Sequence, residues 1–162
     1  MNIFVRRLVQ MVRAYRRTRF RFAAMGRVSW GQGFIVGTRP TIARGAALRI
    51  GDRVHIASGF VSHCHVDIGD DVMISSEVAL IGDDHPFDNS AKTIVEHQPR
   101  SPAHVVLEGD NLIGYGAVIR GPVVIGRGAI VGAKSLVTSD VPANSIVFGS
   151  PARVRRMRRE VR

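Results

Sequence analysis

The chain places an aliphatic side chain at every sixth position over two long blocks. A step of six matches neither the 3.6-residue period of a helix nor the simple alternation of a strand, so it indicates a repeated unit of one short strand and one tight turn. Only Ser62 interrupts the pattern. The two rows of the first block and the row of the second block are Val36, Ile42, Leu48, Val54, Phe60, Val66, Val72 and Val78; Ile50, Ile56, Ile68, Ile74 and Leu80; and Leu107, Ile113, Ile119, Ile125, Val131 and Val137.

Three such units close one triangular coil, with the aliphatic residue inside and a small residue at each corner. Glycine, serine and aspartate recur between the aliphatic positions, and these residues favour tight turns. Stacked coils pair in parallel at about 4.8 Å and bury a continuous apolar column. We therefore expect an all-β fold, and we prefer a parallel β-helix to a β-sandwich with chance spacing.

Units such as IGDRVH, IASGFV and IGRGAI resemble the hexapeptide-repeat family, whose fold is a left-handed parallel β-helix. The resemblance covers about residues 35 to 155. The segment IGRGAIVGAKSLVTSDVPANSIVFGSPARVRR is similar to the acyl-CoA acetyltransferase branch, including its sugar and polysaccharide O-acetyltransferases. The resemblance implies acetyl-CoA as donor, a homotrimer with active sites between subunits, and no required metal.

The repeat stops at Leu80 and resumes at Leu107, and this gap of 27 residues is not a multiple of six. Residues 82–105 must therefore leave the coil, and their prolines and aspartates are poor strand formers. The sequence predicts three parts: a basic amphipathic segment at 1–30, a β-helix domain at 31–152 with the loop 82–105 extruded, and a basic tail at 153–162. A loop this long inside a compact domain is more often functional or disordered than neutral.

His85 lies where this loop begins, in the segment DDHPFD. Acetyl transfer to a hydroxyl needs a base, and a histidine with a pKa near 6.5 can take the proton and later return it. The resemblance implies this role for His85, because the family places its basic histidine at the start of the protruding loop. Asp83, Asp84 or Asp88 could accept the other ring proton, and the sequence does not choose among them. The alternative is a solvated loop histidine.

The resemblance also implies a donor site in the second block. It places Tyr115 and Ala133 along the pantetheine arm, with a backbone N–H near Tyr115 facing the developing oxyanion. Leu112 and Ser139 depart from the residues that relatives often carry there. The implied contacts of coenzyme A are Tyr115, Ala133, Thr138, Ser139, Arg153 and Arg156.

The acceptor side is less defined by the sequence. His63, in the polar segment SHCH, and Asp88 are the candidates for holding a small-molecule or lipid-linked sugar of the envelope or exopolysaccharide type. Serine, an amino-sugar or an antibiotic are alternative acceptors, and a non-catalytic scaffold is the alternative outside enzymes. Zinc carbonic anhydrases share the fold, but this chain lacks their paired histidines at a spacing of five, so we expect no metal site.

The formal charge of +10 is confined to the two ends of the chain. Residues 1–30 hold eight arginines and no acid, whereas residues 31–152 hold nine basic and twelve acidic residues, a net of −3. This distribution and the lack of a recognition motif argue against nucleic acid. One cysteine, Cys64, excludes an internal disulfide framework and suits a cytoplasmic protein.

Residues 3–22 place Val5, Leu8, Val12 and Tyr15 on one helical face. Such a helix either caps the open end of the β-helix or lies on an anionic membrane through residues 1–27. The sequence favours the cap and leaves peripheral contact with the inner face of the membrane open.

Overall fold

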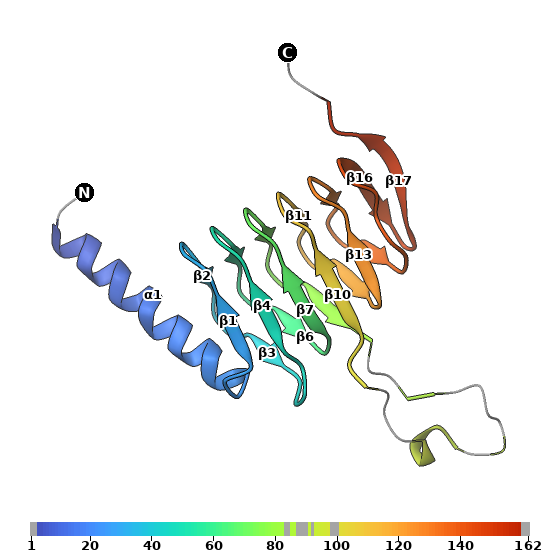
Figure 1. Cartoon of the computed structure of the whole chain (residues 1–162), viewed down its shortest axis with the longest axis horizontal. Coiled ribbons are helices and arrows are strands. Elements are labelled where there is room, and N and C mark those ends of the chain that lie inside the picture. The colour runs from blue at the N-terminus through green and yellow to red at the C-terminus, as the bar shows by residue number, and fades with distance from the viewer. Residues whose placement is uncertain (1–2, 83–84, 87–90, 92, 98–100, 160–162) are drawn as a thin grey trace.

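Three sheets of short strands form the faces of a prism in the computed structural model, which describes residues 3–82, 85–86, 91, 93–97 and 101–159 (Figure 1). Sheet A contains β1 (Val28–Trp30), β4 (Leu48–Ile50), β7 (His65–Ile68), β10 (His104–Leu107) and β13 (Val123–Ile125). Sheet B contains β2 (Ile35–Val36), β5 (His55–Ile56), β8 (Met73–Ile74), β11 (Leu112–Ile113), β14 (Ile130–Val131), β16 (Ser145–Gly149) and β17 (Ala152–Met157). Sheet C contains β3 (Thr41–Ile42), β6 (Val61–Ser62), β9 (Ala79–Ile81), β12 (Val118–Arg120) and β15 (Leu136–Val137).

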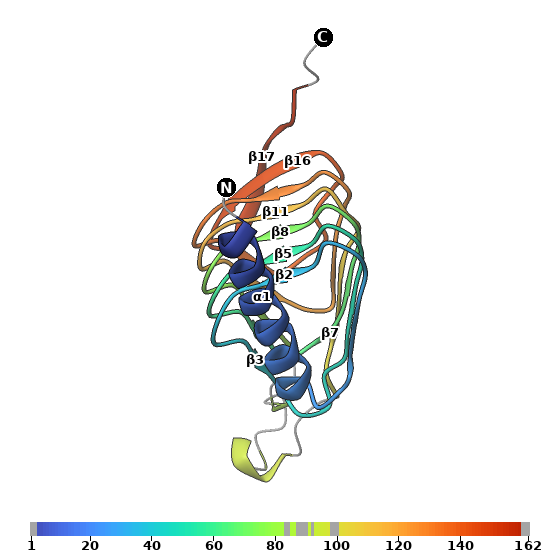
Figure 2. The same cartoon turned by 90° about the vertical axis from the view of Figure 1, so that its left-hand side faces the viewer.

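The chain visits sheets A, B and C in that order and returns to A one coil further along the axis. Each strand from β1 to β12 pairs in parallel with the strand of the next coil, as Leu48 does with Val66. Seen along the axis from the N-terminal end, the coils recede from the viewer in a left-handed sense (Figure 2). The prediction of an all-β, left-handed parallel β-helix is confirmed.

The predicted aliphatic rows form the interior of the prism. Along β4, for example, Leu48 and Ile50 are buried and Arg49 between them is exposed. Ser62 is also fully buried, and its hydroxyl donates to the carbonyl of Cys64 at 3.1 Å. The one polar interruption of the repeat is therefore an interior position whose hydroxyl is hydrogen-bonded locally, which removes most of the cost of burying it.

Each corner of the prism is named here by the two sheets that it joins. The BC corner, for example, follows the strands of sheet B. One residue per coil at this corner has a positive φ angle: Arg39, Gly59, Glu77, Gly116 and Lys134, with φ from 54° to 74°. Successive corners thus stack with the same backbone conformation, and side chains at equivalent positions form columns along the axis.

The two ends of the prism are closed differently. At the start, α1 (Ile3–Ala23) crosses the first coil, and the ring of Phe20 packs 5.6 Å from that of Phe34. At the far end, β17 runs antiparallel to β16 and completes sheet B. The cap is made by the C-terminal part of α1, because the predicted apolar face of Val5, Leu8, Val12 and Tyr15 remains 39–63% exposed.

An arm leaves the CA corner after β9 and returns to start β10 at His104, inside the loop expected at 82–105 (Figure 1). Its first residue, Gly82, has φ of +153°, a conformation that other residues rarely adopt. A Cβ atom at Gly82 would lie only 2.7 Å from the Cβ of Ala103. Within the described part of the arm, η1 (Ile94–Glu96) is the one regular element.

Candidate functional site

His85 is held on the arm by a backbone carbonyl. Its Nδ1 lies 2.6 Å from the carbonyl oxygen of His97, and because a carbonyl can only accept, Nδ1 carries the proton and donates it. The other ring nitrogen, Nε2, is left with its lone pair in the neutral ring. This is the tautomer that a general base acting through Nε2 requires.

A capped helical turn sets the position of that carbonyl. Thr93 precedes η1, and its backbone N–H and hydroxyl both donate to the Glu96 carboxylate, at 2.7 and 2.8 Å. These two bonds lower the pKa of Glu96, with the hydroxyl bond the larger cause. The His97 N–H then donates to the carbonyl of Ile94. The Thr93–Glu96 capping box therefore fixes the residue whose carbonyl orients His85.

The carboxylates proposed for that orienting role were Asp83, Asp84 and Asp88, and all three lie outside the described residues. Among the described residues, the Nδ1 contact of His85 is made by the backbone carbonyl of His97. The sequence carried one usable signal for this arrangement, the Thr-x-x-Glu spacing of Thr93 and Glu96, which is typical of a capping box.

A cluster of polar side chains at the base of the arm is built around Asp67 of sheet A. Its carboxylate accepts two hydrogen bonds from Arg49, at 2.6 and 2.8 Å, and lies 2.9 Å from Nε2 of His104. The bond from Arg49 is the largest cause holding the pKa of Asp67 below its usual range. Because His104 is the first residue after the arm, this cluster ties the returning chain to two neighbouring coils.

His63, the candidate acceptor contact, lies at the CA corner one coil before the arm. Its backbone N–H donates to the carbonyl of Leu80 at 2.8 Å, and the next residue, Cys64, approaches the start of the arm at Gly82. His63 is half-buried. The structure therefore brings His63 to the base of the arm that carries His85. Asp88, the second acceptor candidate, lies outside the described residues.

Tyr115 and Ala133, the candidate donor contacts, stack in adjacent coils at the BC corner. The N–H of Lys134 donates to the carbonyl of Tyr115 at 2.9 Å, and the ammonium of Lys134 lies 4.5 Å from the centre of the Tyr115 ring. Tyr115 is half exposed and Ala133 is exposed. The corner thus presents an aromatic ring, a small residue and a cation in one column. Lys134 is the member of this column that the sequence did not single out.

The remaining donor candidates divide between two places. Arg153 pairs with Phe148 at the end of sheet B nearest the Tyr115 column, whereas Arg156 pairs with Ile146 further from it. Thr138 and Ser139 follow β15 at the CA corner and are exposed. Tyr115, Ala133 and Arg153 therefore lie along one edge of sheet B, and Thr138 and Ser139 lie across sheet C from them.

The arm that carries His85 and the Tyr115–Ala133 column of one chain leave from different corners of the prism. Tyr115 begins the BC corner, and the arm leaves from the CA corner on the opposite side of sheet C. A strand rises about 3.3 Å per residue, so the two corners are separated by roughly 15–20 Å. Within the described residues, no three His, Cys, Asp or Glu side chains gather in a way that would hold a metal ion.

The family model described as "Bacterial transferase hexapeptide (six repeats)" matches residues 104–139. A solved hexapeptide-repeat acetyltransferase of Vibrio cholerae, in complex with acetyl coenzyme A, is similar over 91% of this chain and 78% of its own, with 27% identity and a TM-score of 0.76. A solved polySia-specific acetyltransferase is similar over 81% of this chain and 65% of its own, with 27% identity and a TM-score of 0.62.

Among curated proteins, a 2,3,4,5-tetrahydropyridine-2,6-dicarboxylate N-acetyltransferase of Staphylococcus aureus is 48% identical over 64 residues. That segment is 40% of this chain and 27% of the relative, so the match spans about a quarter of the relative's length. The six-residue repeat, the three-sheet coil and the family match agree with one another. The chain is therefore similar in repeat and fold to hexapeptide-repeat acetyltransferases, and its segment 104–139 matches their family model.

Proposed function

We propose that this protein transfers an acetyl group from acetyl-CoA to a hydroxyl of a saccharide, with His85 as general base. The observation that carries the proposal is the bond from His85 Nδ1 to the carbonyl of His97, which leaves Nε2 as the proton acceptor. The acetyl-CoA bound to the similar Vibrio cholerae enzyme supports the donor. The likeness to a polySia-specific acetyltransferase supports a saccharide acceptor.

In the proposed reaction, Nε2 of His85 takes the hydroxyl proton as the oxygen attacks the thioester carbonyl carbon. The C–S bond then breaks, and the imidazolium returns the proton to the departing thiolate. The products are an acetyl ester and free coenzyme A. A backbone N–H of the Tyr115 corner would stabilise the oxyanion, a role that needs a fixed donor rather than a particular side chain. Arg153 and Arg156 would bind the phosphates of coenzyme A.

Two corners on opposite sides of sheet C cannot form one compact site within a single copy. We therefore assign the two halves of each site to neighbouring copies in a homotrimer, with the arm of one copy reaching the BC corner of the next. His63 at the base of the arm and Asp88 on it would contact the acceptor. Thr138 and Ser139 lie at the CA corner, on the same copy as the arm. They would therefore border the donor groove that the BC corner of the next copy forms.

The test of the base is release of coenzyme A from acetyl-CoA with a panel of saccharides, serine and amino-sugars. His85→Ala is expected to lose about 10²- to 10⁴-fold in turnover while keeping its fold. His55→Ala is a matched control, because His55 is an exposed histidine on the outer face of sheet B. Near-normal turnover by a folded His85→Ala protein would contradict the proposed role.

The shared site has its own test. His85→Ala and Ala133→Trp each inactivate one half, and co-assembled trimers of the two variants are expected to recover about one quarter of the sites if neighbouring copies combine. Recovery is expected only after subunit exchange. If the two inactive variants never complement each other, the division of the site between copies is wrong.

N-acetylation is the second candidate, favoured by the 48% identity to an N-acetyltransferase over 64 residues. The two products differ in chemistry, because mild alkali hydrolyses an ester and leaves an amide intact. An alkali-stable product formed from an amino-sugar, without turnover of hydroxyl acceptors, would replace O-acetylation by N-acetylation.

A further inference from the structure

The exposed surface of α1 is strongly basic and strongly apolar together. Its 21 residues include seven arginines and no acid, and Phe20 is its one buried side chain. Large apolar side chains nevertheless cover much of the helix, with Ile3 71%, Met11 69% and Phe22 78% exposed. An exposed apolar helix is unusual on a soluble surface unless something covers it. Its arginines indicate an anionic partner.

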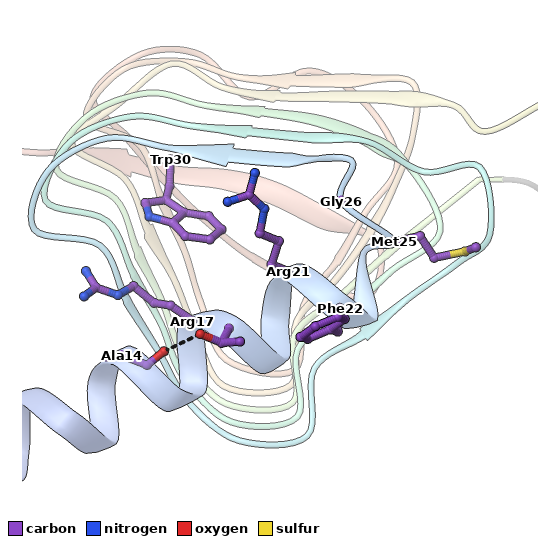
Figure 3. A pocket seen from close by; sticks show the side chains of 8 residues that line it. Ala14, Arg17, Arg21, Phe22, Met25, Gly26 and Trp30 are labelled. Atoms are coloured by element: carbon purple, nitrogen blue, oxygen red, sulfur yellow. Dashed lines mark hydrogen bonds between the residues drawn. The ribbon is translucent and has the colours of Figure 1, made fainter.

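A cleft lies between the C-terminal half of this helix and the first coil (Figure 3). Its volume is about 790 Å³, and Arg17, Arg21, Phe22, Met25 and Trp30 line it. Arg17 and Arg21 extend on the same side of the helix, with the Trp30 ring next to Arg21. The cleft therefore combines two cations with an aromatic floor.

The two arginines are four residues apart and so lie on one helical face, where like charges repel. Neither has an acidic partner in the part of the chain that the structure describes. An anion between them would relieve the repulsion, and the planar guanidinium group suits phosphate oxygens particularly well. The apolar rings beside the two arginines would then be free to contact lipid hydrocarbon.

From these observations we infer that α1 docks on an anionic bilayer and that the Arg17–Arg21–Trp30 cleft receives the phosphate headgroup of a membrane lipid. Basic amphipathic helices lie in the plane of the interface, with their apolar side chains among the acyl chains. Tryptophan is enriched at that depth. The body between residues 31 and 152 has a net charge of −3, so the attraction is confined to the ends of the prism.

The inferred contact of α1 with the bilayer is peripheral. Within the residues that the structure describes, no helix has the length and apolar character needed to cross a membrane. The docking surface is at the first coil, and the arm and the Tyr115–Ala133 column lie further along the axis. The inference stands apart from acetyl transfer, since vesicle binding can be measured with no acceptor or donor present.

Trp30 is the one tryptophan of the chain, so its fluorescence reports on the cleft directly. The full-length protein is titrated with vesicles of phosphatidylcholine alone and of phosphatidylcholine with phosphatidylglycerol. A blue shift of Trp30 emission, and quenching by brominated phosphatidylglycerol, are expected with the anionic vesicles only. Raising the ionic strength is expected to weaken the binding.

The double variant Arg17→Gln/Arg21→Gln is expected to bind anionic vesicles roughly 10- to 30-fold more weakly, at about fivefold per arginine near the surface. Its matched control is Arg44→Gln/Arg120→Gln, which removes two exposed arginines of the coils and is expected to bind normally. Circular dichroism confirms that both variants keep the β-helix. Equal binding by the two double variants would overturn the assignment of the cleft.

Two further measurements of Trp30 emission, with added inorganic phosphate and at different protein concentrations, test the alternatives to membrane binding. A Trp30 response to free phosphate without any response to anionic vesicles would make the cleft a soluble phosphate site and overturn the membrane inference. A Trp30 emission that changes with protein concentration, again without vesicle binding, would show that a second copy of the chain covers α1.

Discussion

The coils and the arm hold their side chains by different means. In the coils, each interior residue is fixed by strand pairing above and below and by burial in one column, as Ile74 is between Ile56 and Ile113. On the described part of the arm, His85 is positioned by a hydrogen bond to a carbonyl that a capped turn supports. Substitutions in the coils should therefore cost mainly stability, whereas substitutions in the arm should cost mainly activity.

The largest expected effect comes from the interior of the coils. Ile74→Ala removes a side chain that is 2% exposed and should lower the free energy of unfolding by about 2–5 kcal/mol. Met73→Ala, on the outer face of the same strand, should change it by no more than about 0.5 kcal/mol. Denaturant unfolding of the two variants measures the difference. Equal losses would mean that the interior column does not dominate stability.

The second effect concerns Gly82, where the coil becomes the arm. Gly82→Ala should cost about 1–3 kcal/mol of stability from backbone strain, with a further loss of activity because the Cβ atom would push against Ala103 and move the arm. Gly45→Ala is the control at the same corner of an earlier coil. It also has a positive φ, of 101°, but its nearest new contact is Pro102 at 3.9 Å.

Unfolding and turnover are measured on both glycine variants. The two should show similar strain, and only Gly82→Ala should lose activity beyond its loss of stability. If Gly45→Ala impairs turnover as much as Gly82→Ala does, then the crowding at the base of the arm is not what positions the arm.

The same contrast explains what could be predicted from the sequence. The fold follows from the six-residue step because the repeat is local, and each aliphatic position reports its own burial. Even the interruption at Ser62 keeps its place in the interior. The exit of the chain after Leu80 follows from arithmetic, since 27 residues cannot continue a period of six.

The orientation of His85 could not be read in this way. The group that accepts the hydrogen bond from His85 Nδ1 is the main-chain carbonyl of His97. Every residue has such a carbonyl, so no side-chain pattern marks it. Thr93 and Glu96 gave a readable sign of a helical turn, but not of what that turn would support. The exposed face of α1 was likewise visible as a pattern, whereas the packing of Phe20 that leaves it exposed depends on the tertiary fold.

The third effect tests whether the capped turn works through His85. Glu96→Gln weakens the carboxylate bonds to Thr93 and should lower kcat on the order of 10-fold, because His85 loses its fixed tautomer and orientation. The KM for acetyl-CoA and the melting temperature should hardly change. Glu77→Gln, in the coils, is the control, since Glu77 lies at the BC corner and its carboxylate pairs there with exposed Arg39.

Steady-state kinetics across pH separate this role from a general loss of structure. In the wild type, kcat/KM should rise with the deprotonation of one group, and Glu96→Gln should lower the plateau of that curve. A variant with a lower melting temperature and an unchanged plateau of kcat/KM would show that the turn supports the fold of the arm and does not act through His85.

The smallest effect is expected at Asp67, which joins the coils to the returning arm. Its pKa is lowered, chiefly by the hydrogen bond from Arg49, so its contribution to stability is present above the unfolded-state pKa of about 3.9 and is lost as the pH falls through the lower folded value. Asp67→Asn should therefore be slightly less stable than the wild type at neutral pH, and the gap should close in acid. Because Arg49 is 75% exposed, water screens the pair, and we expect a shift in melting temperature of only about one or two degrees. Thermal unfolding of both proteins from neutral pH to about pH 3 measures the gap. A gap that persists in acid would mean that Asp67 supports the arm by its shape and packing, not by its charge.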